Sequence, residues 1–145
     1  MRTIIVGGPR TGKSTMASRL GAPVYCTDPL SKVKEPLERV TYSPDELDWG
    51  EDSDWITNHW LPQRGPWTIE GHATARVLRK YYEKCRLGIG EETAPPCDRI
   101  IVLTRQYYWN EGQRRMHEGV MTVWNGIKYH YEPGIGDLPV PVDYF

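Results

Sequence analysis

Residues 7–14, which read Gly-Gly-Pro-Arg-Thr-Gly-Lys-Ser, match the phosphate-binding pattern G-x-x-x-x-G-K-[ST] at every position. Glycines let such a loop curl so that several backbone N–H groups point at phosphate oxygens. The pattern assigns Lys13 to the β- and γ-phosphates and the Ser14 hydroxyl to Mg²⁺. An apolar segment precedes the loop and a helix-forming segment follows it, so a helix dipole would also favour phosphate. The sequence therefore predicts binding of a nucleoside triphosphate. The expected contacts are Gly8, Pro9, Arg10, Thr11, Gly12, Lys13, Ser14 and Thr15.

Two acidic residues follow predicted strands. Asp28 comes after Val24–Cys26, and Glu70 comes after Trp67–Ile69. Phosphoryl transfer needs a positioned acceptor, a carboxylate that orients it or takes its proton, Mg²⁺, and cations near the developing charge. Asp28 is the first candidate for the base, with a turn residue before Pro29 as the alternative. Glu70 is the candidate for holding Mg²⁺, directly or through water. Its alternatives are a helix cap or the base.

Arginines supply the cations for this chemistry. Arg76 lies on the helix expected after Glu70, and its two-pronged guanidinium suits a phosphate of the acceptor. Arg105, Arg114 and Arg115 follow the next strand, where kinases with this loop carry a lid. At least one of the three is expected to close over the triphosphate and stabilise transition-state charge. Neighbouring helix positions diverge by about 100°, so one of Arg114 and Arg115 is expected to point inward.

The other residue types that often carry chemistry form no recognisable site. The four histidines make no catalytic triad or metal set and are expected to be structural: His59, His72, His117 and His130. The three cysteines are odd in number and widely spaced, which predicts reduced thiols rather than a disulfide framework or a zinc site: Cys26, Cys85 and Cys97.

Short apolar segments alternate with helical ones along the chain. Strands are expected at 3–6, 24–26, 67–69, 99–103 and, at an edge, 126–132; helices are expected at 13–20, 43–61, 72–84 and 107–124. This alternation is typical of a parallel sheet covered on both faces. We therefore expect an α/β protein with the three-layer P-loop NTPase fold and a central, mostly parallel sheet of four to five strands. Because ligands bind at the carboxyl ends of such strands, the loop, Asp28, Glu70 and Thr104–Arg105 should meet at one edge.

Length and charge limit the possible functions. The 145 residues suit a single domain, 1–145, in which the Pro- and Gly-bearing segment 133–145 is expected to be an extended tail. The net charge of −1 provides no general attraction to nucleic acid or anionic membrane, so a polyanionic partner would have to meet local basic clusters. No apolar run approaches the length of a transmembrane helix, and the first strand begins at once. We expect a cytoplasmic protein without a leader or a membrane partner.

These motifs together resemble small P-loop kinases of the nucleotide and polynucleotide kinase group. The resemblance rests on residues 7–15, on Thr27-Asp28, on Trp67–Lys80 (W-T-I-E-G-H-A-T-A-R-V-L-R-K) and on Arg114–Arg115. Within that group the chain is most similar to bacteriophage-type 5-hydroxymethyluridine DNA kinases, which phosphorylate the base hydroxymethyl group in DNA on the way to hypermodified thymidines. The resemblance implies ATP and Mg²⁺ at residues 7–15, Asp28 as base, Glu70 near the metal, and basic residues after the fourth strand as the lid. A phage-encoded protein would act in the host cytoplasm.

The expected function is ATP-dependent transfer of the γ-phosphoryl group to a hydroxyl of a nucleic acid or nucleotide. The favoured acceptor is 5-hydroxymethyluracil in DNA. One alternative is a kinase of free nucleosides or nucleoside monophosphates. Another is a nucleotide-dependent switch or accessory ATPase that moves phosphate only to water. A kinase-like toxin acting on a sugar nucleotide has no positive support in the sequence, and the oligomeric state stays open.

Overall fold

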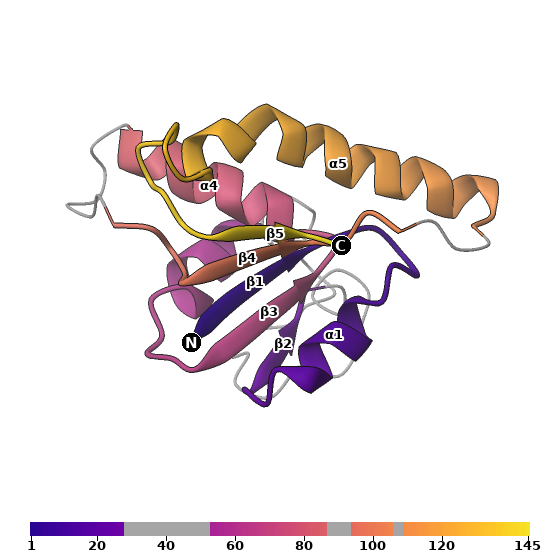
Figure 1. Ribbon diagram of the computed structural model, residues 1–145, viewed down its shortest axis with the longest axis horizontal. Helices are drawn as coiled ribbons and strands as arrows, with labels where there is room; N and C mark the ends of the chain where they lie inside the picture. The colour runs from indigo at the N-terminus through magenta and orange to yellow at the C-terminus, as the bar shows by residue number, and fades with distance from the viewer. Residues whose placement is uncertain (28–52, 87–93, 106–108) are drawn as a thin grey trace.

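In the part of the chain that the structure describes, the central sheet has five strands, and all of them run parallel. The structure is a computed structural model that describes residues 1–27, 53–86, 94–105 and 109–145. Within these residues the strands are β1 (Arg2–Val6), β2 (Val24–Cys26), β3 (Trp67–Gly71), β4 (Arg99–Val102) and β5 (Val142–Tyr144). Their order is β2-β3-β1-β4-β5 (Figure 1). The predicted α/β class with a mostly parallel sheet is confirmed.

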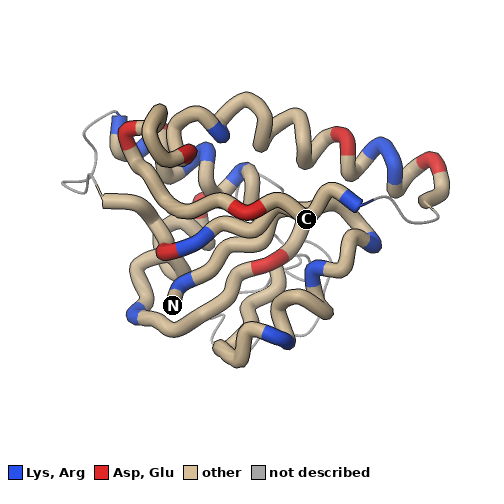
Figure 2. Tube along the Cα trace, in the orientation of Figure 1, with Lys and Arg blue, Asp and Glu red and all other residues tan. Residues whose placement is uncertain are grey.

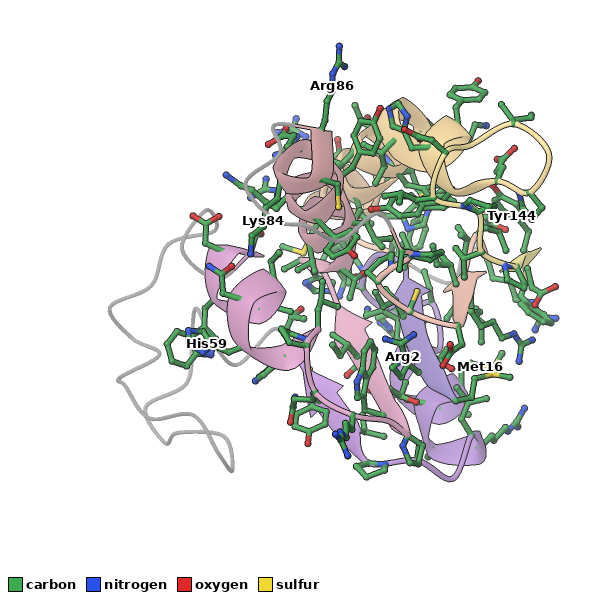
Figure 3. The ribbon with its side chains drawn as sticks, turned by 90° about the vertical axis from the view of Figure 1, so that its left-hand side faces the viewer. Arg2, Met16, His59, Lys84, Arg86 and Tyr144 are labelled. Carbon is green, nitrogen blue, oxygen red and sulfur yellow. The ribbon has the colours of Figure 1, made fainter. Side chains whose placement is uncertain are left out.

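Helices cover both faces of this sheet. The described helices are α1 (Lys13–Arg19), the π-helical segment η2 (Ile56–Trp60), α4 (Thr74–Arg86) and α5 (Glu111–Tyr131). In Figure 1, α1 lies below the sheet, whereas α4 and α5 lie together above it. η2 packs against α4, and Lys84 of α4 donates a hydrogen bond of 2.9 Å to Asn58 of η2 (Figure 3). The sheet is therefore the middle of three layers.

The central strands are apolar on both faces because both faces are covered. Ile4 and Val6 of β1 belong to the larger core, which includes the buried residues of α4 and α5. Ile5 belongs to a smaller core with Ala17 of α1. Side chains alternate between the two faces of a strand, so β1 contributes to both cores. The largest buried aromatic side chains all belong to the larger core: Trp67, Trp124 and Tyr131.

The fifth strand is not where the sequence predicted it. The expectation of an edge strand at 126–132 is wrong, because α5 continues to Tyr131. Its buried residues recur at the three- and four-residue spacing of a helix face: His117, Val120, Trp124, Ile127 and Tyr131. β5 lies instead within the segment 133–145 that was expected to be an extended tail, and it pairs with β4.

The other predicted elements lie close to the observed ones. α5 begins at Glu111 rather than near residue 107, and Asn110 caps it. The Asn110 side chain accepts the Gln113 N–H at 2.8 Å, while the Gln113 side chain accepts the Asn110 N–H at 3.0 Å. This reciprocal pair satisfies two backbone donors at the helix start. Of the helix predicted at 43–61, residues 43–52 lie outside the described part, and residues 53–60 are helical.

Charged residues of both signs are distributed over the described elements (Figure 2). Acidic and basic residues lie close together in the first turns of α5. Among the helices that the structure describes, none combines the length and the apolar character needed to cross a membrane.

Candidate functional site

The loop that matches the phosphate-binding pattern connects the carboxyl end of β1 to the start of α1. Its backbone takes positive φ angles at Arg10 (56°) and Gly12 (91°). Such a conformation strains a residue with a side chain, so glycine is favoured at position 12. Among the described residues, no atom lies within 4 Å of where a Gly12 Cβ would stand, and the space beside it is open. Turns of this kind direct successive N–H groups into an anion-binding concavity.

The Gly8 carbonyl holds the Lys13 side chain against the loop. The carbonyl oxygen accepts hydrogen bonds from Lys13 Nζ at 2.6 Å and from Thr11 Oγ1 at 2.9 Å. The Lys13 side chain therefore lies back over the loop, and Lys13 is only 7% exposed. The loop backbone thus holds a buried cation beside its own N–H groups.

Glu70 stands at the same edge of the sheet, one strand away from the loop. It lies in β3 opposite Ile5 of β1 and is 3% exposed. Partners in a parallel register share a face of the sheet, and Ile5 faces α1. Glu70 is therefore on the face where α1 packs against β3, and Ser14 is the second residue of that helix. This arrangement suits a carboxylate and a hydroxyl that act on one bound cation.

Threonines hold the neighbouring strand ends together. Thr27 follows β2 and donates its N–H to the Glu70 carbonyl at 2.8 Å, while its hydroxyl accepts the Ala73 N–H at 3.3 Å. The Thr74 hydroxyl donates to the Ile5 carbonyl at 2.8 Å. β1, β2, β3 and α4 are thus joined where Glu70 stands. Asp28, the first candidate for the base, is the next residue after Thr27 and lies outside the described residues.

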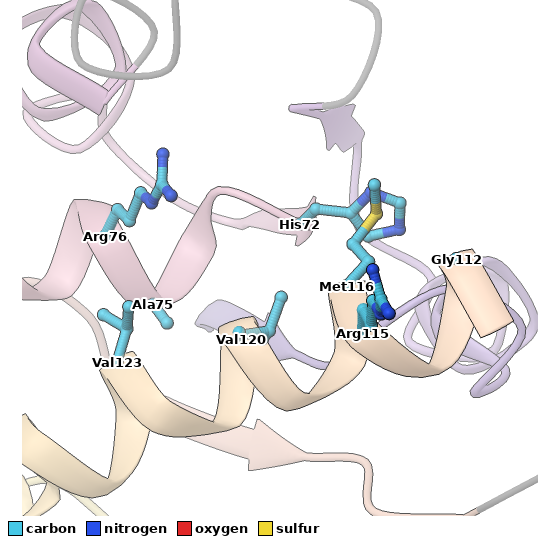
Figure 4. A pocket seen from close by; sticks show the side chains of 9 residues that line it. His72, Ala75, Arg76, Gly112, Arg115, Met116, Val120 and Val123 are labelled. Atoms are coloured by element: carbon cyan, nitrogen blue, oxygen red, sulfur yellow. The ribbon is translucent and has the colours of Figure 1, made fainter.

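All of the predicted arginines except Arg114 line one of two cavities. A cavity of about 640 Å³ beside the loop and α1 is lined by Arg10, Thr11, Gly12, Thr15, Met16, Arg19, Leu103, Arg105 and Phe145. A second cavity of about 340 Å³ lies between α4 and α5 (Figure 4). Arg76 and His72 line it from one side, and Arg115 and Met116 line it from the other. Arg105 therefore lines the same cavity as the loop between β1 and α1, whereas Arg76 and Arg115 share a different cavity.

Arg114 and Arg115 both bond to glutamates of their own helix. Arg114 contacts Glu111 at 2.6 Å and Glu118 at 2.5 Å, and Arg115 contacts Glu111 at 3.2 Å. Hydrogen bonding to Arg114 lowers the pKa of Glu111, and the same bond raises the pKa of Arg114. Both arginines are well exposed, so these contacts form a surface network.

His117 is the residue of the site that sequence reasoning missed. Its Nδ1 accepts the Gly8 N–H at 3.1 Å in a buried contact. Burial and the positive charge of Lys13 lower the pKa of His117 below its ordinary value of 6.5. The sequence held one sign of this role. His117 is the first residue of the buried face of α5, and a buried polar side chain needs a hydrogen-bond partner.

No group of three or more metal-ligating His, Cys, Asp or Glu side chains occurs among the described residues. Ser14 and Glu70 are the predicted Mg²⁺ ligands, and Mg²⁺ usually takes few protein ligands and completes its coordination with phosphate oxygens and water. Comparisons of the chain with protein-family models, with curated proteins and with solved structures found no match.

Proposed function

We propose that this protein has a P-loop NTPase fold and is an ATP-dependent kinase that transfers the γ-phosphoryl group to a hydroxyl of a nucleotide or nucleic acid. The observation that carries the proposal is the loop at the carboxyl end of β1, where Gly12 takes a left-handed conformation and Lys13 is held over the Gly8 carbonyl. Glu70, buried one strand away, adds the carboxylate that such chemistry requires.

The cavity beside α1 is suited to the nucleotide. Arg10 and Arg105 bring guanidinium groups to this cavity. One guanidinium can donate two hydrogen bonds to the oxygens of one phosphate. Met16, Leu103 and Phe145 bring apolar and aromatic surface that could receive a base. Its volume of about 640 Å³ falls within the range of small-molecule sites.

The loop residues have separate roles in this proposal. Lys13, held at the Gly8 carbonyl, neutralises charge on the β- and γ-phosphates. The Ser14 hydroxyl and the Glu70 carboxylate would hold Mg²⁺, which, when bound, would supply positive charge to the phosphates. Asp28 is the first candidate for taking the acceptor's proton, and Glu70 is the second.

The cavity between α4 and α5 is the candidate acceptor site. Arg76 and Arg115 contribute positive charge, while Ala75, Val120 and Val123 contribute apolar surface. At about 340 Å³ it is suited to one nucleotide unit rather than to a duplex. A free mononucleotide or an unpaired base in DNA would meet this description. The favoured acceptor remains 5-hydroxymethyluracil in DNA.

The test offers ATP labelled at the γ-phosphate with three acceptors: DNA containing hydroxymethyluracil, ordinary DNA with 5′-hydroxyl ends, and free nucleotides. We expect label in the modified DNA, and no label with the Lys13→Ala variant. Label on free nucleotides alone would refute DNA as the acceptor but would support kinase activity. Steady hydrolysis of ATP with no labelled acceptor would favour a switch or accessory ATPase. Full transfer by Asp28→Asn would exclude a base at that position.

A further inference from the structure

One side chain just before α5 and one in its second turn contact the first half of the phosphate-binding loop. His117 Nδ1 accepts the Gly8 N–H at 3.1 Å, and Trp109 Nε1 donates to the Pro9 carbonyl at 2.7 Å. The two rings also contact each other, with centroids 4.4 Å apart. We call this pair, Trp109 and His117, the loop clamp. It joins α5 to the loop through two consecutive residues, Gly8 and Pro9.

The clamp requires glycine at position 8. A Cβ there would lie 2.4 Å from the Cβ of His117 and 2.5 Å from its Nδ1. The backbone of the loop and the histidine are therefore in direct contact. The phosphate-binding pattern leaves this position unspecified, so the close approach of α5, rather than the pattern, explains why glycine is needed here.

The clamp acts on the residue that receives Lys13. The Gly8 N–H is bonded to His117, while the Gly8 carbonyl accepts from Lys13 and Thr11. Both polar groups of Gly8 are thus fixed. The orientation of this residue decides where the lysine rests, and α5 fixes that orientation from outside the loop.

The hydrogen bond requires a neutral imidazole. Nδ1 can accept the Gly8 N–H only when it carries no proton, which leaves the proton on Nε2. Burial and Lys13 lower the pKa of His117, while Glu118 opposes them. Among the described residues, Lys13 from the loop side and Glu118 from α5 are the charged side chains that act on the ring. The surroundings therefore maintain the form that can accept.

We propose that His117 is a positioning residue, which together with Trp109 holds Gly8 so that the loop and Lys13 are arranged to receive phosphate. The inference rests on the proposed function, because it assumes that the loop binds a triphosphate. It adds that nucleotide affinity depends on a helix outside the loop. Since α5 also carries Arg114 and Arg115, the clamp fixes these arginines relative to the loop as well.

Two variants separate the hydrogen bond from packing. In His117→Asn the amide oxygen takes the place of Nδ1 and accepts without being able to gain a proton. In His117→Phe a ring remains beside Trp109 but has no acceptor. Calorimetric titration with Mg²⁺ and a non-hydrolysable ATP analogue at pH 8 should show about tenfold weaker binding for His117→Phe, the effect of one lost hydrogen bond. His117→Asn should bind within about threefold of the unchanged protein.

Lowering the pH from 8 through the lowered pKa of His117 gives a readout that packing alone would not change. The unchanged protein should lose more affinity than His117→Asn does, because only the imidazole gains a proton. The asparagine variant also corrects for protonation of the phosphate itself. NMR of the imidazole nitrogens in the unchanged protein should find Nδ1 unprotonated at pH 8, whether or not a variant folds.

The outcomes distinguish the two proposals. If the unchanged protein and Lys13→Ala both fail to bind the nucleotide, the proposed function is overturned and the role of His117 with it. If the unchanged protein binds but folded His117→Phe binds equally well, only the positioning role is overturned. A proton on Nδ1 at pH 8, or the same pH dependence in His117→Asn, would also overturn it.

Discussion

The phosphate-binding loop and the first turns of α5 both present cations, but they hold them in opposite ways. Lys13 is 7% exposed and donates to a backbone carbonyl. The side chains of Arg114 and Arg115 are 48% and 76% exposed and bond to glutamates of the same helix. The first cation is fixed by buried backbone, and the other two are held by surface ion pairs.

The difference indicates which parts of the site are preformed. A buried hydrogen-bonded cation keeps its place because moving it leaves polar groups without partners. Exposed ion pairs contribute little to stability, since water and salt screen them. Arg114 and Arg115 could therefore exchange a glutamate for a phosphate at small cost. In our proposal the loop is the fixed part and the arginines are the adjustable part.

The largest expected effect comes from removing the fixed cation. Lys13→Ala should reduce phosphoryl transfer by about 1,000-fold, because the charge on the transferred phosphate loses its main protein partner. Labelled ATP measures the loss. Lys13→Arg is the matched control, and it should also be strongly impaired because a guanidinium does not fit where the ammonium lies. Activity of Lys13→Ala near that of the unchanged protein would remove the loop from the mechanism.

A methyl group at Gly8 tests the contact between the two regions. Gly8→Ala should lower the free energy of unfolding by about 1–3 kcal/mol, because its Cβ would overlap His117. The control is Gly126→Ala on α5, where the described residues leave open space around the added methyl. That change should raise stability by up to about 1 kcal/mol. Thermal unfolding compares the two variants with the unchanged protein. A Gly8→Ala variant as stable as the unchanged protein would mean that α5 does not approach the loop this closely.

The pH dependence of stability tests the same contact more gently. The pKa of His117 is lower in the folded chain than its ordinary 6.5, so folding favours the neutral ring. The contribution of the neutral ring to the free energy of unfolding is complete above pH 6.5. It is lost as the pH falls through the lowered pKa of His117. Denaturant unfolding between pH 5 and 8 should show this loss in the unchanged protein and a smaller one in His117→Asn. Parallel curves would show that His117 does not contribute.

The smallest effect on stability is expected for the adjustable cations. Replacing Arg114 and Arg115 together by alanine should leave the melting temperature almost unchanged, because their ion pairs are exposed. Phosphoryl transfer should nevertheless fall if either arginine closes over the phosphate. A large drop in melting temperature would show that these arginines are structural, and unchanged transfer would leave Arg105 as the remaining lid candidate.

Local patterns predicted most of the fold. β1 to β4 follow from short apolar runs that both faces of a parallel sheet require. The loop follows from a motif whose glycines and lysine all lie within the short stretch 7–14. The prediction of the fifth strand was wrong because the local pattern of Gly126–Glu132 fits either a strand or a helix. The buried helix face that ends at Tyr131 makes this segment helical.

The site was predicted only where its residues are local. Glu70 was found because it ends a strand, but the bond between Gly8 and His117 joins residues 109 positions apart. No spacing rule reaches across that separation. The arginines of α5 could be named but not oriented, because their contacts depend on Glu111 and Glu118. A tertiary contact brings His117 to the loop, whereas ion pairs within α5 orient its arginines.

The most direct test of the central claim is whether the loop itself binds the triphosphate. Isotope-labelled protein would be titrated with Mg²⁺ and a non-hydrolysable ATP analogue while NMR follows the amides of Gly8, Gly12 and Lys13. The account predicts saturable shifts that are largest at Gly12 and Lys13, with Gly8 retaining its bond to His117. Saturable binding that leaves these three amides unmoved, or no binding at all, would contradict it.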